Sequence, residues 1–162
     1  MTAPSPAELR ALAAAQGVEA MLHAADRPMP TVESAAEAIG VPVAAMTKNI
    51  VWLVAGAPVL AIAAGLARID DRALARRFGV ARSKVGMASP ERALELTGFV
   101  VGCMPSFGHR TRLPTLVDTA VLRLARVYGG TGDPAVLISL ATADLLRLTG
   151  GEPLSICRAA PA

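Results

Sequence analysis

The sequence predicts an α+β fold, in which a single domain has one curved, mixed and largely antiparallel β-sheet flanked by helices. Three observations support this prediction. Short apolar segments alternate with turn residues, which is typical of strands. Segments with helix-capping residues lie between them at irregular intervals. The chain has 162 residues, of which 53% are hydrophobic, and this is enough for one sizeable core, so we assign residues 1–162 to one domain.

Helices are predicted where a capping residue precedes a segment of helical length and a glycine follows it. The first of them begins with a capping box, in which Ser5 and Glu8 are spaced to satisfy each other's backbone N–H groups. A shorter turn of helix is expected at residues 42–46. The predicted helices run from Ser5 to Gly17, Thr31 to Gly40, Asp70 to Gly79, Ser89 to Gly98 and Thr142 to Gly150.

Strands are predicted at the short apolar segments between these helices. Residues 50–54 and 59–62 flank Ala55 to Pro58, which favours a hairpin around a tight turn. Phe99 to Val101 should form a buried strand that leads into a loop ending at His109. The other predicted strands are residues 18–24, 114–117, 126–128 and 136–140.

One segment imitates a membrane span. Residues 50–67 carry no charged side chain over almost the length that a bilayer requires. Gly56, Pro58 and Gly65 interrupt this segment, so a hairpin fits it better than a spanning helix. The N-terminus has neither a basic start nor an apolar core, so no signal peptide is predicted. We therefore expect a cytoplasmic protein with no membrane partner.

Composition excludes several functional classes. A mean hydropathy of +0.48 excludes intrinsic disorder. Aromatic residues make up only 3% of the chain, which disfavours a nucleic-acid reader built on rows of stacked bases. Two cysteines are too few for a disulfide scaffold, and neither they nor the two histidines have metal-ligand spacing. We therefore expect no metal and no cofactor.

Two features could carry chemistry. Lys48 stands where a strand begins, and its ammonium group suits a phosphate or ester oxygen, although a solvated lysine is the alternative. Residues 102–108, hereafter the glycine loop, could present backbone N–H groups to a developing oxyanion. The alternative is a structural loop with Phe107 in the core. Cys103 activated by His109 is a further possibility, but a packed thiol is favoured because no orienting group is evident.

Positive charge is concentrated in one segment. The net charge is +3, and residues 68–92 hold seven basic and three acidic side chains, which gives +4 there and −1 elsewhere. Such a patch fits a phosphate backbone, and an ordinary solvated helix face is the alternative. The candidate phosphate contacts are Arg72, Arg76, Lys84, Arg110 and Arg112.

A series of segments, taken in order, resembles one known family. The segments are Pro30 to Ala36, Ile39 to Pro42, Lys48 to Val51, Val59 to Gly65, Leu74 to Gly79, Lys84 to Ala88, Leu96 to Gly98, Gly102 to Gly108, Asp118, and Ala143 to Gly150. Their order and spacing resemble the YbaK and prolyl-tRNA synthetase editing-domain family of aminoacyl-tRNA deacylases. With no synthetase domain attached, the chain looks like a free-standing trans-editing protein.

The resemblance implies hydrolysis of the ester that joins a wrongly attached small amino acid to the terminal adenosine of a tRNA. It implies that Lys48 is the catalytic residue, which contacts that adenosine or the aminoacyl group. Substrate hydroxyls and a held water would carry the reaction without a metal or a cofactor. The partner would be tRNA, contacted by the basic residues named above, with an aminoacyl-tRNA synthetase as a further candidate. The implied substrate-binding residues are Met46, Thr47, Gly102, Cys103, Met104, Pro105, Ser106, Phe107, Gly108 and Asp118.

The sequence departs from the family at positions that shape the pocket. Asp133 to Val136 stands where some members carry a histidine. Ser106 replaces a second proline, and Cys103 replaces a frequent glycine. These departures leave the identity of the edited amino acid open. A non-enzymatic regulatory module that binds a nucleotide or another small ligand through Lys48 and the glycine loop is the alternative function.

Overall fold

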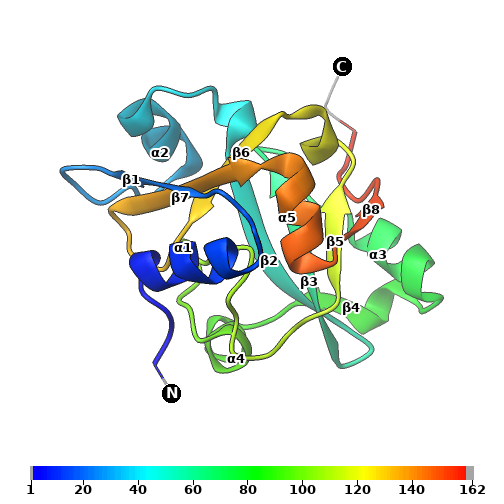
Figure 1. Cartoon of the computed structure of the whole chain (residues 1–162). Helices are drawn as coiled ribbons and strands as arrows, with labels where there is room; N and C mark the ends of the chain where they lie inside the picture. The colour runs from blue at the N-terminus through cyan, green and yellow to red at the C-terminus, as the bar shows by residue number, and fades with distance from the viewer. Residues whose placement is uncertain (1, 160–162) are drawn as a thin grey trace.

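The structure is a computed structural model that describes residues 2–159. In this part of the chain the strands form two sheets (Figure 1). The strands are β1 (Met21–Ala24), β2 (Thr47–Val54), β3 (Ala57–Ala64), β4 (Val85–Met87), β5 (Thr115–Asp118), β6 (Arg126–Gly130), β7 (Val136–Ala141) and β8 (Glu152–Leu154). The larger sheet has the order β4-β2-β3-β5-β8, and the smaller sheet has the order β1-β7-β6.

The predicted helices are all present. They are α1 (Pro6–Ala15), α2 (Val32–Ile39), α3 (Asp71–Phe78), α4 (Pro90–Thr97) and α5 (Thr142–Thr149), with short 3-10 turns η1 (Val43–Ala45), η2 (Arg82–Lys84) and η3 (Val121–Arg123). The capping box of Ser5 and Glu8 starts α1 as predicted. The predicted cap of α5 is wrong, because Ala141 occupies the N-cap and Thr142 is the first helical residue. The Thr142 hydroxyl is buried without a hydrogen-bond partner among the described residues.

The predicted hairpin is confirmed as β2 and β3, which pair antiparallel along their whole length. Its turn consists of Ala55 and Gly56, whose φ angles of 48° and 84° are both positive. Two positive φ angles give a type I′ turn, whose twist matches that of the flanking strands. Among the described residues, no helix combines the length and the apolar character needed to cross a bilayer.

The fold class is confirmed as mixed and largely antiparallel, and the sheet is divided in two. The β3–β5 and β5–β8 pairs are parallel, and the other strand pairs are antiparallel. The two sheets meet at an isolated parallel bridge between Met46 and Tyr128. The Thr47 hydroxyl donates to the Tyr128 carbonyl at 3.2 Å across the same junction. Strands β4 and β8 were not among the strands predicted from the sequence.

The strand predicted at Phe99 to Val101 is wrong. Phe99 is buried, but Val100 and Val101 are 63% and 51% exposed in a turn. The Thr97 hydroxyl accepts a hydrogen bond from the Phe99 N–H at 3.1 Å and donates to the Phe99 carbonyl at 3.3 Å. The backbone of Phe99 is therefore occupied by its own turn, so the apolar segment forms no strand.

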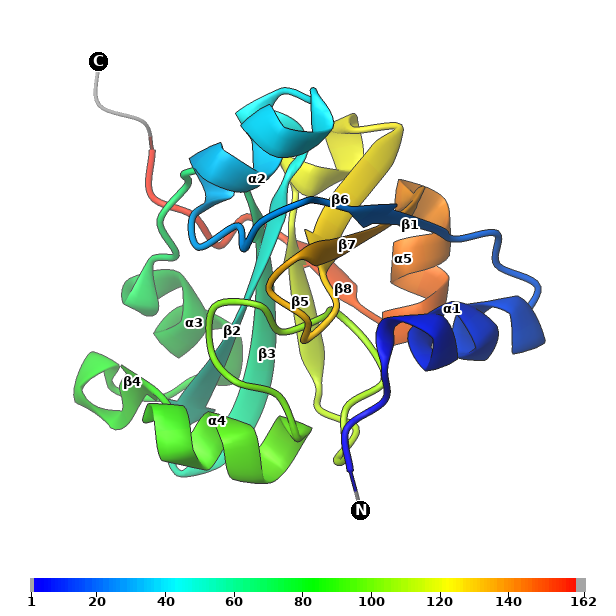
Figure 2. The ribbon, with the colours of Figure 1, turned by 90° about the vertical axis from the view of Figure 1, so that its left-hand side faces the viewer.

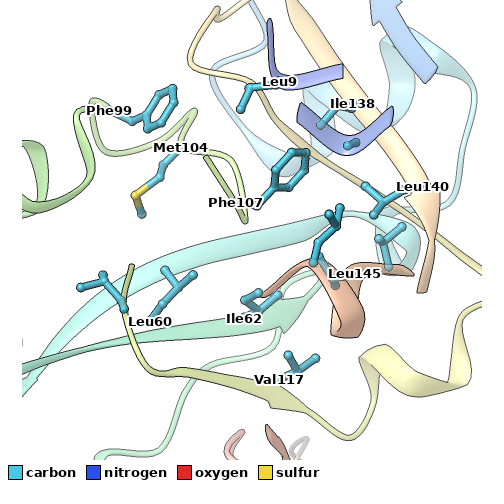
Figure 3. Packing of buried hydrophobic residues seen from close by; sticks show 14 of the residues in the cluster. Leu9, Leu60, Ile62, Phe99, Met104, Phe107, Val117, Ile138, Leu140 and Leu145 are labelled. Atoms are coloured by element: carbon cyan, nitrogen blue, oxygen red, sulfur yellow. The ribbon is translucent and has the colours of Figure 1, made fainter. Parts of the chain in front are cut away.

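The main core lies between the two sheets (Figure 3). One face of the larger sheet contributes Leu60, Ile62 and Val117, and the inner face of the smaller sheet contributes Ile138 and Leu140. Helices α1, α4 and α5 close this layer, while α3 covers the opposite face of the larger sheet (Figure 1). A third cluster joins α2 to the outer face of the smaller sheet through Ala35, Met46 and Leu137. These layers fix the start of β2 against α2, where the candidate site lies.

Two leucines of contrasting burial test this core. Leu60 is 1% exposed and Leu66 is 60% exposed. We expect Leu60→Ala to lower the free energy of unfolding by about 2–5 kcal/mol because it leaves a cavity. Leu66→Ala, the same substitution at the surface, should change it by no more than about 0.5 kcal/mol. Urea denaturation monitored by circular dichroism measures both values, and equal losses would contradict this assignment of the core.

Candidate functional site

A cleft of about 270 Å³ lies beside the beginning of β2. Strand β4 pairs only with Trp52 to Val54 of β2, and β6 meets the chain at the Met46–Tyr128 bridge, so residues 48–50 of β2, which lie between these two contacts, pair with no strand on that side. Four segments line the cleft: the start of β2, the region from Met29 to Ala35 with Met46, the glycine loop with Val101, and the turn between β6 and β7. The cleft therefore brings together parts of the chain that lie far apart in the sequence.

Lys48 lies at this open edge and is half-buried. No hydrogen bond or ion pair joins its ammonium group to another residue in the described part of the chain, so it is available to a ligand. Its positive charge also lowers the pKa of Cys157, although burial and the charge of Asp118 outweigh this effect. The ammonium group is therefore close enough to the C-terminal segment to influence its thiol.

Asn49, the next residue of β2, holds the glycine loop in place. Its side-chain Nδ2 donates to the Met104 carbonyl at 2.9 Å, and its Oδ1 accepts from the Ser106 hydroxyl at 2.8 Å. Both polar atoms of one amide are thus used on the same loop. The sequence analysis gave Asn49 no role, because a single asparagine in a strand does not reveal which distant loop it will meet.

The glycine loop is also bonded to the turn between β6 and β7, and Figure 2 shows these two segments side by side. Gly132 N–H donates to the Cys103 carbonyl at 2.7 Å, and the Cys103 thiol donates to the Gly132 carbonyl at 3.4 Å. A Cβ atom added at Gly130 would collide with the Cys103 carbonyl oxygen. Gly130 therefore permits the close approach of β6 to the loop.

The cleft side of the glycine loop offers backbone donors. Gly102, Cys103 and Met104 line the cleft, and their N–H groups donate to no acceptor among residues 2–159. Such groups can bind an oxygen that develops negative charge. The bond from Gly132 fixes the Cys103 carbonyl, which shares a peptide plane with the Met104 N–H, so this donor is held in position before any ligand arrives.

Cys103 and His109 lack the properties of a nucleophile and its base. Burial and the negative charge of Asp133 raise the pKa of the Cys103 thiol. Burial lowers the pKa of His109, whose Nε2 is hydrogen-bonded to the Pro105 carbonyl at 2.7 Å. Nε2 must donate in this bond because a carbonyl can only accept. The thiol is therefore protonated at neutral pH, which disfavours thiol catalysis.

The structure separates the predicted substrate-binding residues into two groups. Met46, Thr47, Gly102, Cys103 and Met104 line the cleft with Lys48. Ser106, Phe107 and Gly108 instead border a separate cavity of about 210 Å³, next to α1 and α5.

Pro105 and Asp118 are buried away from the cleft. Asp118 Oδ1 accepts the N–H groups of Ile156 and Cys157 at 2.9 and 3.1 Å, and Oδ2 accepts that of Ala120 at 3.1 Å. With three backbone donors on one carboxylate, Asp118 has a structural explanation that needs no ligand. It fastens the C-terminal segment to the end of β5.

The predicted phosphate contacts do not gather at one place. Arg72 and Arg76 are exposed on α3, Lys84 is exposed in η2, and Arg112 borders the cavity next to α1 and α5. Arg110 donates to the Glu95 carbonyl at 3.3 Å. None of the five borders the cleft. If they contact a nucleic acid, they would contact the part of that nucleic acid that lies outside the cleft.

A protein-family model described as the aminoacyl-tRNA editing domain matches residues 26–148. The chain belongs to this family. The matched range includes every segment that lines the cleft, from Met29 to Leu137.

Similar proteins span most of this editing domain. The uncharacterized protein YwhH of Bacillus subtilis (strain 168) is 34% identical over 116 residues, which cover 71% of this chain and 72% of YwhH. The crystal structure of a protein proposed to be a trans-editing enzyme for prolyl tRNA synthetase is 26% identical, with a TM-score of 0.85 over 98% of this chain and all of the other. The crystal structure of hypothetical protein APE2540 is 25% identical, with a TM-score of 0.85 over 93% of this chain and 99% of the other.

Gly130 allows a test of how the editing domain holds its glycine loop. We expect Gly130→Ala to lower the free energy of unfolding by about 1–3 kcal/mol, because its Cβ would push against the Cys103 carbonyl. Gly86→Ala is the matched control, since Gly86 lies in β4 with open space where the Cβ would be. Thermal and urea denaturation of the two variants measure the difference. A Gly130→Ala protein as stable as the control would show that the loop is not tightly packed against β6.

The two thiols of the editing domain test its electrostatics. Burial, with the charge of Asp118, raises the pKa of Cys157 to about 12, and the pKa of Cys103 is raised as well. Raised values leave less thiolate in the folded protein at any pH below them. We expect alkylation by iodoacetamide at about pH 8 to be at least about tenfold slower in the folded protein than in urea. Mass spectrometry of each cysteine measures both rates, and equal rates would contradict the assigned environments.

Proposed function

We propose that this editing domain is a cytoplasmic deacylase that acts in trans and removes a small, wrongly attached amino acid from the 3′ end of a tRNA. One observation carries the proposal: an unpaired lysine and unbonded backbone N–H groups line the same cleft. Family membership and the similarity to a protein proposed as a trans-editing enzyme for prolyl tRNA synthetase support it. A synthetase is a candidate partner on the same ground.

The reaction in this proposal is hydrolysis of one ester bond. Lys48 binds an oxygen of the terminal nucleotide or of the ester and orients the carbonyl. The N–H groups of Gly102, Cys103 and Met104 stabilise the oxyanion that forms when the carbonyl is attacked. The attacking group is a water molecule positioned by a hydroxyl of the terminal ribose. The bond between the carbonyl carbon and the ribose oxygen then breaks, and that oxygen takes up a proton from the attacking water.

The shape of the cleft fits such a substrate. A volume of about 270 Å³ admits a small amino acid together with part of the terminal nucleoside, and not a long stretch of nucleic acid. Apolar side chains of Val32, Met46 and Leu137 form part of its wall. Differences of one methylene group contribute only about 1–3 kcal/mol to recognition, which is why a second, editing site adds fidelity to aminoacylation.

Lys48 provides the direct test of this mechanism. We expect Lys48→Ala to lower the deacylation rate about 100-fold or more, because the carbonyl loses its orienting cation. Lys48→Arg should restore only part of the rate, since a guanidinium group differs from an ammonium group in size and geometry. Release of labelled amino acid from a panel of mischarged tRNAs, under single-turnover conditions, measures these rates. Wild-type rates in Lys48→Ala would contradict the mechanism.

A second lysine provides the matched control. Lys84 is exposed in η2 and does not border the cleft, so Lys84→Ala should keep the wild-type single-turnover rate of deacylation when the protein is in saturating excess over tRNA. Circular dichroism should show the same folded content in all variants. If no tRNA in the panel is deacylated by the wild-type protein while a nucleotide still binds, the alternative of a non-enzymatic binding module would be supported instead.

A further inference from the structure

Asp133 provides a negative charge in the cleft that Lys48 also lines. Of the residues that line it, only Lys48 and Asp133 carry a charge. No ion pair joins these two side chains in the part of the chain that the structure describes, so neither neutralises the other directly. The proposed mechanism uses Lys48 and leaves Asp133 without a role.

Asp133 is held in position by its own turn. Its Oδ1 accepts the Ala135 N–H at 2.9 Å, and its backbone N–H donates to the Thr131 hydroxyl at 3.3 Å. The fully buried Thr131 also donates to the Val136 carbonyl at 2.7 Å, which anchors the turn to β7. One carboxylate oxygen is therefore engaged by the backbone, and no described residue occupies the other.

The carboxylate lies close to the glycine loop. The neighbouring residue, Gly132, is hydrogen-bonded to Cys103 in both directions. The negative charge of Asp133 also helps to raise the pKa of the Cys103 thiol, after burial. A ligand whose carbonyl oxygen meets the loop N–H groups would therefore have its adjacent atoms next to Asp133.

An aminoacyl ester carries a positive charge at that place. Its α-ammonium group is attached to the carbon atom next to the ester carbonyl, so groups that recognise the two must be neighbours. A carboxylate is the side chain that pairs best with an ammonium group through charge-assisted hydrogen bonds. An N-acylated amino acid has no such charge and could not form this pair with the carboxylate.

We propose that Asp133 binds the free α-ammonium group of the aminoacyl ester and so restricts the cleft to aminoacyl groups that are not acylated on nitrogen. This inference rests on the proposed deacylase function and deepens it. It names Asp133 as a specificity-determining residue, which acts on the substrate class rather than on the chemical step. Peptidyl-type esters of tRNA are thereby excluded.

The test compares two substrates and three proteins. Both substrates are one tRNA charged with the amino acid that the wild-type protein removes fastest. In the first the α-amino group of the amino acid is free, and in the second it is acetylated. The proteins are the wild type, Asp133→Asn and Asp26→Asn. Asparagine can still accept the Ala135 N–H, so the turn is retained. Asp26 provides a matched control because its side chain is 88% exposed and lies outside the cleft.

We expect the wild type and Asp26→Asn to hydrolyse the free form at least about tenfold faster than the N-acetylated form. In Asp133→Asn the rate for the free form should fall about tenfold, while the rate for the N-acetylated form stays unchanged. Equal wild-type rates on the two substrates would overturn the inference. So would an equal loss on both substrates in Asp133→Asn, because that would indicate a purely structural role.

A binding measurement separates this inference from the proposed function. Amide analogues of aminoacyl-adenosine, with and without an N-acetyl group, bind without being hydrolysed. If the wild type deacylates no tRNA, the proposed function fails. The inference still stands if calorimetry shows weaker binding of the N-acetyl analogue and loss of this preference in Asp133→Asn. It fails if the affinities of the two analogues are equal.

Discussion

The site depends on one side-chain amide. Asn49 joins the glycine loop to β2 through both of its polar atoms, and it stands directly after Lys48, which lines the cleft. Because the loop contains no strand or helix of its own, these bonds and those of Gly132 are what hold it against β2 and β6 and fix the direction of the Met104 N–H. Donors fixed before a substrate arrives need no reorganisation during the reaction, and this is the condition for stabilising an oxyanion.

The two sheets give the cleft its position. One face of the larger sheet packs on the smaller sheet, while the start of β2 passes beyond both β4 and the main core. The cleft beside it is bordered by α2, by the glycine loop and by the turn that carries Asp133. Two opposite charges therefore line one cleft with mostly apolar walls, Lys48 half-buried and Asp133 exposed.

Local signals made much of the fold predictable, and long-range contacts set the limit. Helix caps, terminal glycines and the hairpin turn are encoded by neighbouring residues, so the helices and the β2–β3 hairpin follow from the sequence. The role of Asp118 does not, because its partners, Ile156 and Cys157, lie 38 and 39 residues away. Lys48 and the first half of the glycine loop were proposed from the sequence and line one cleft, but Asn49 was given no role. The role of Asn49 depends on hydrogen bonds to a loop that begins more than fifty residues later in the chain.

The open edge of β2 has a consequence for solubility. An exposed strand edge is a template on which another chain can add a strand, and natural proteins protect such edges with charged side chains, lysine above all. Between its contacts with β6 and β4, the edge of β2 lies beside Lys48 in a cleft that is also lined by α2 and the glycine loop. The segments that form the cleft thus also cover the edge on which another chain could otherwise add a strand.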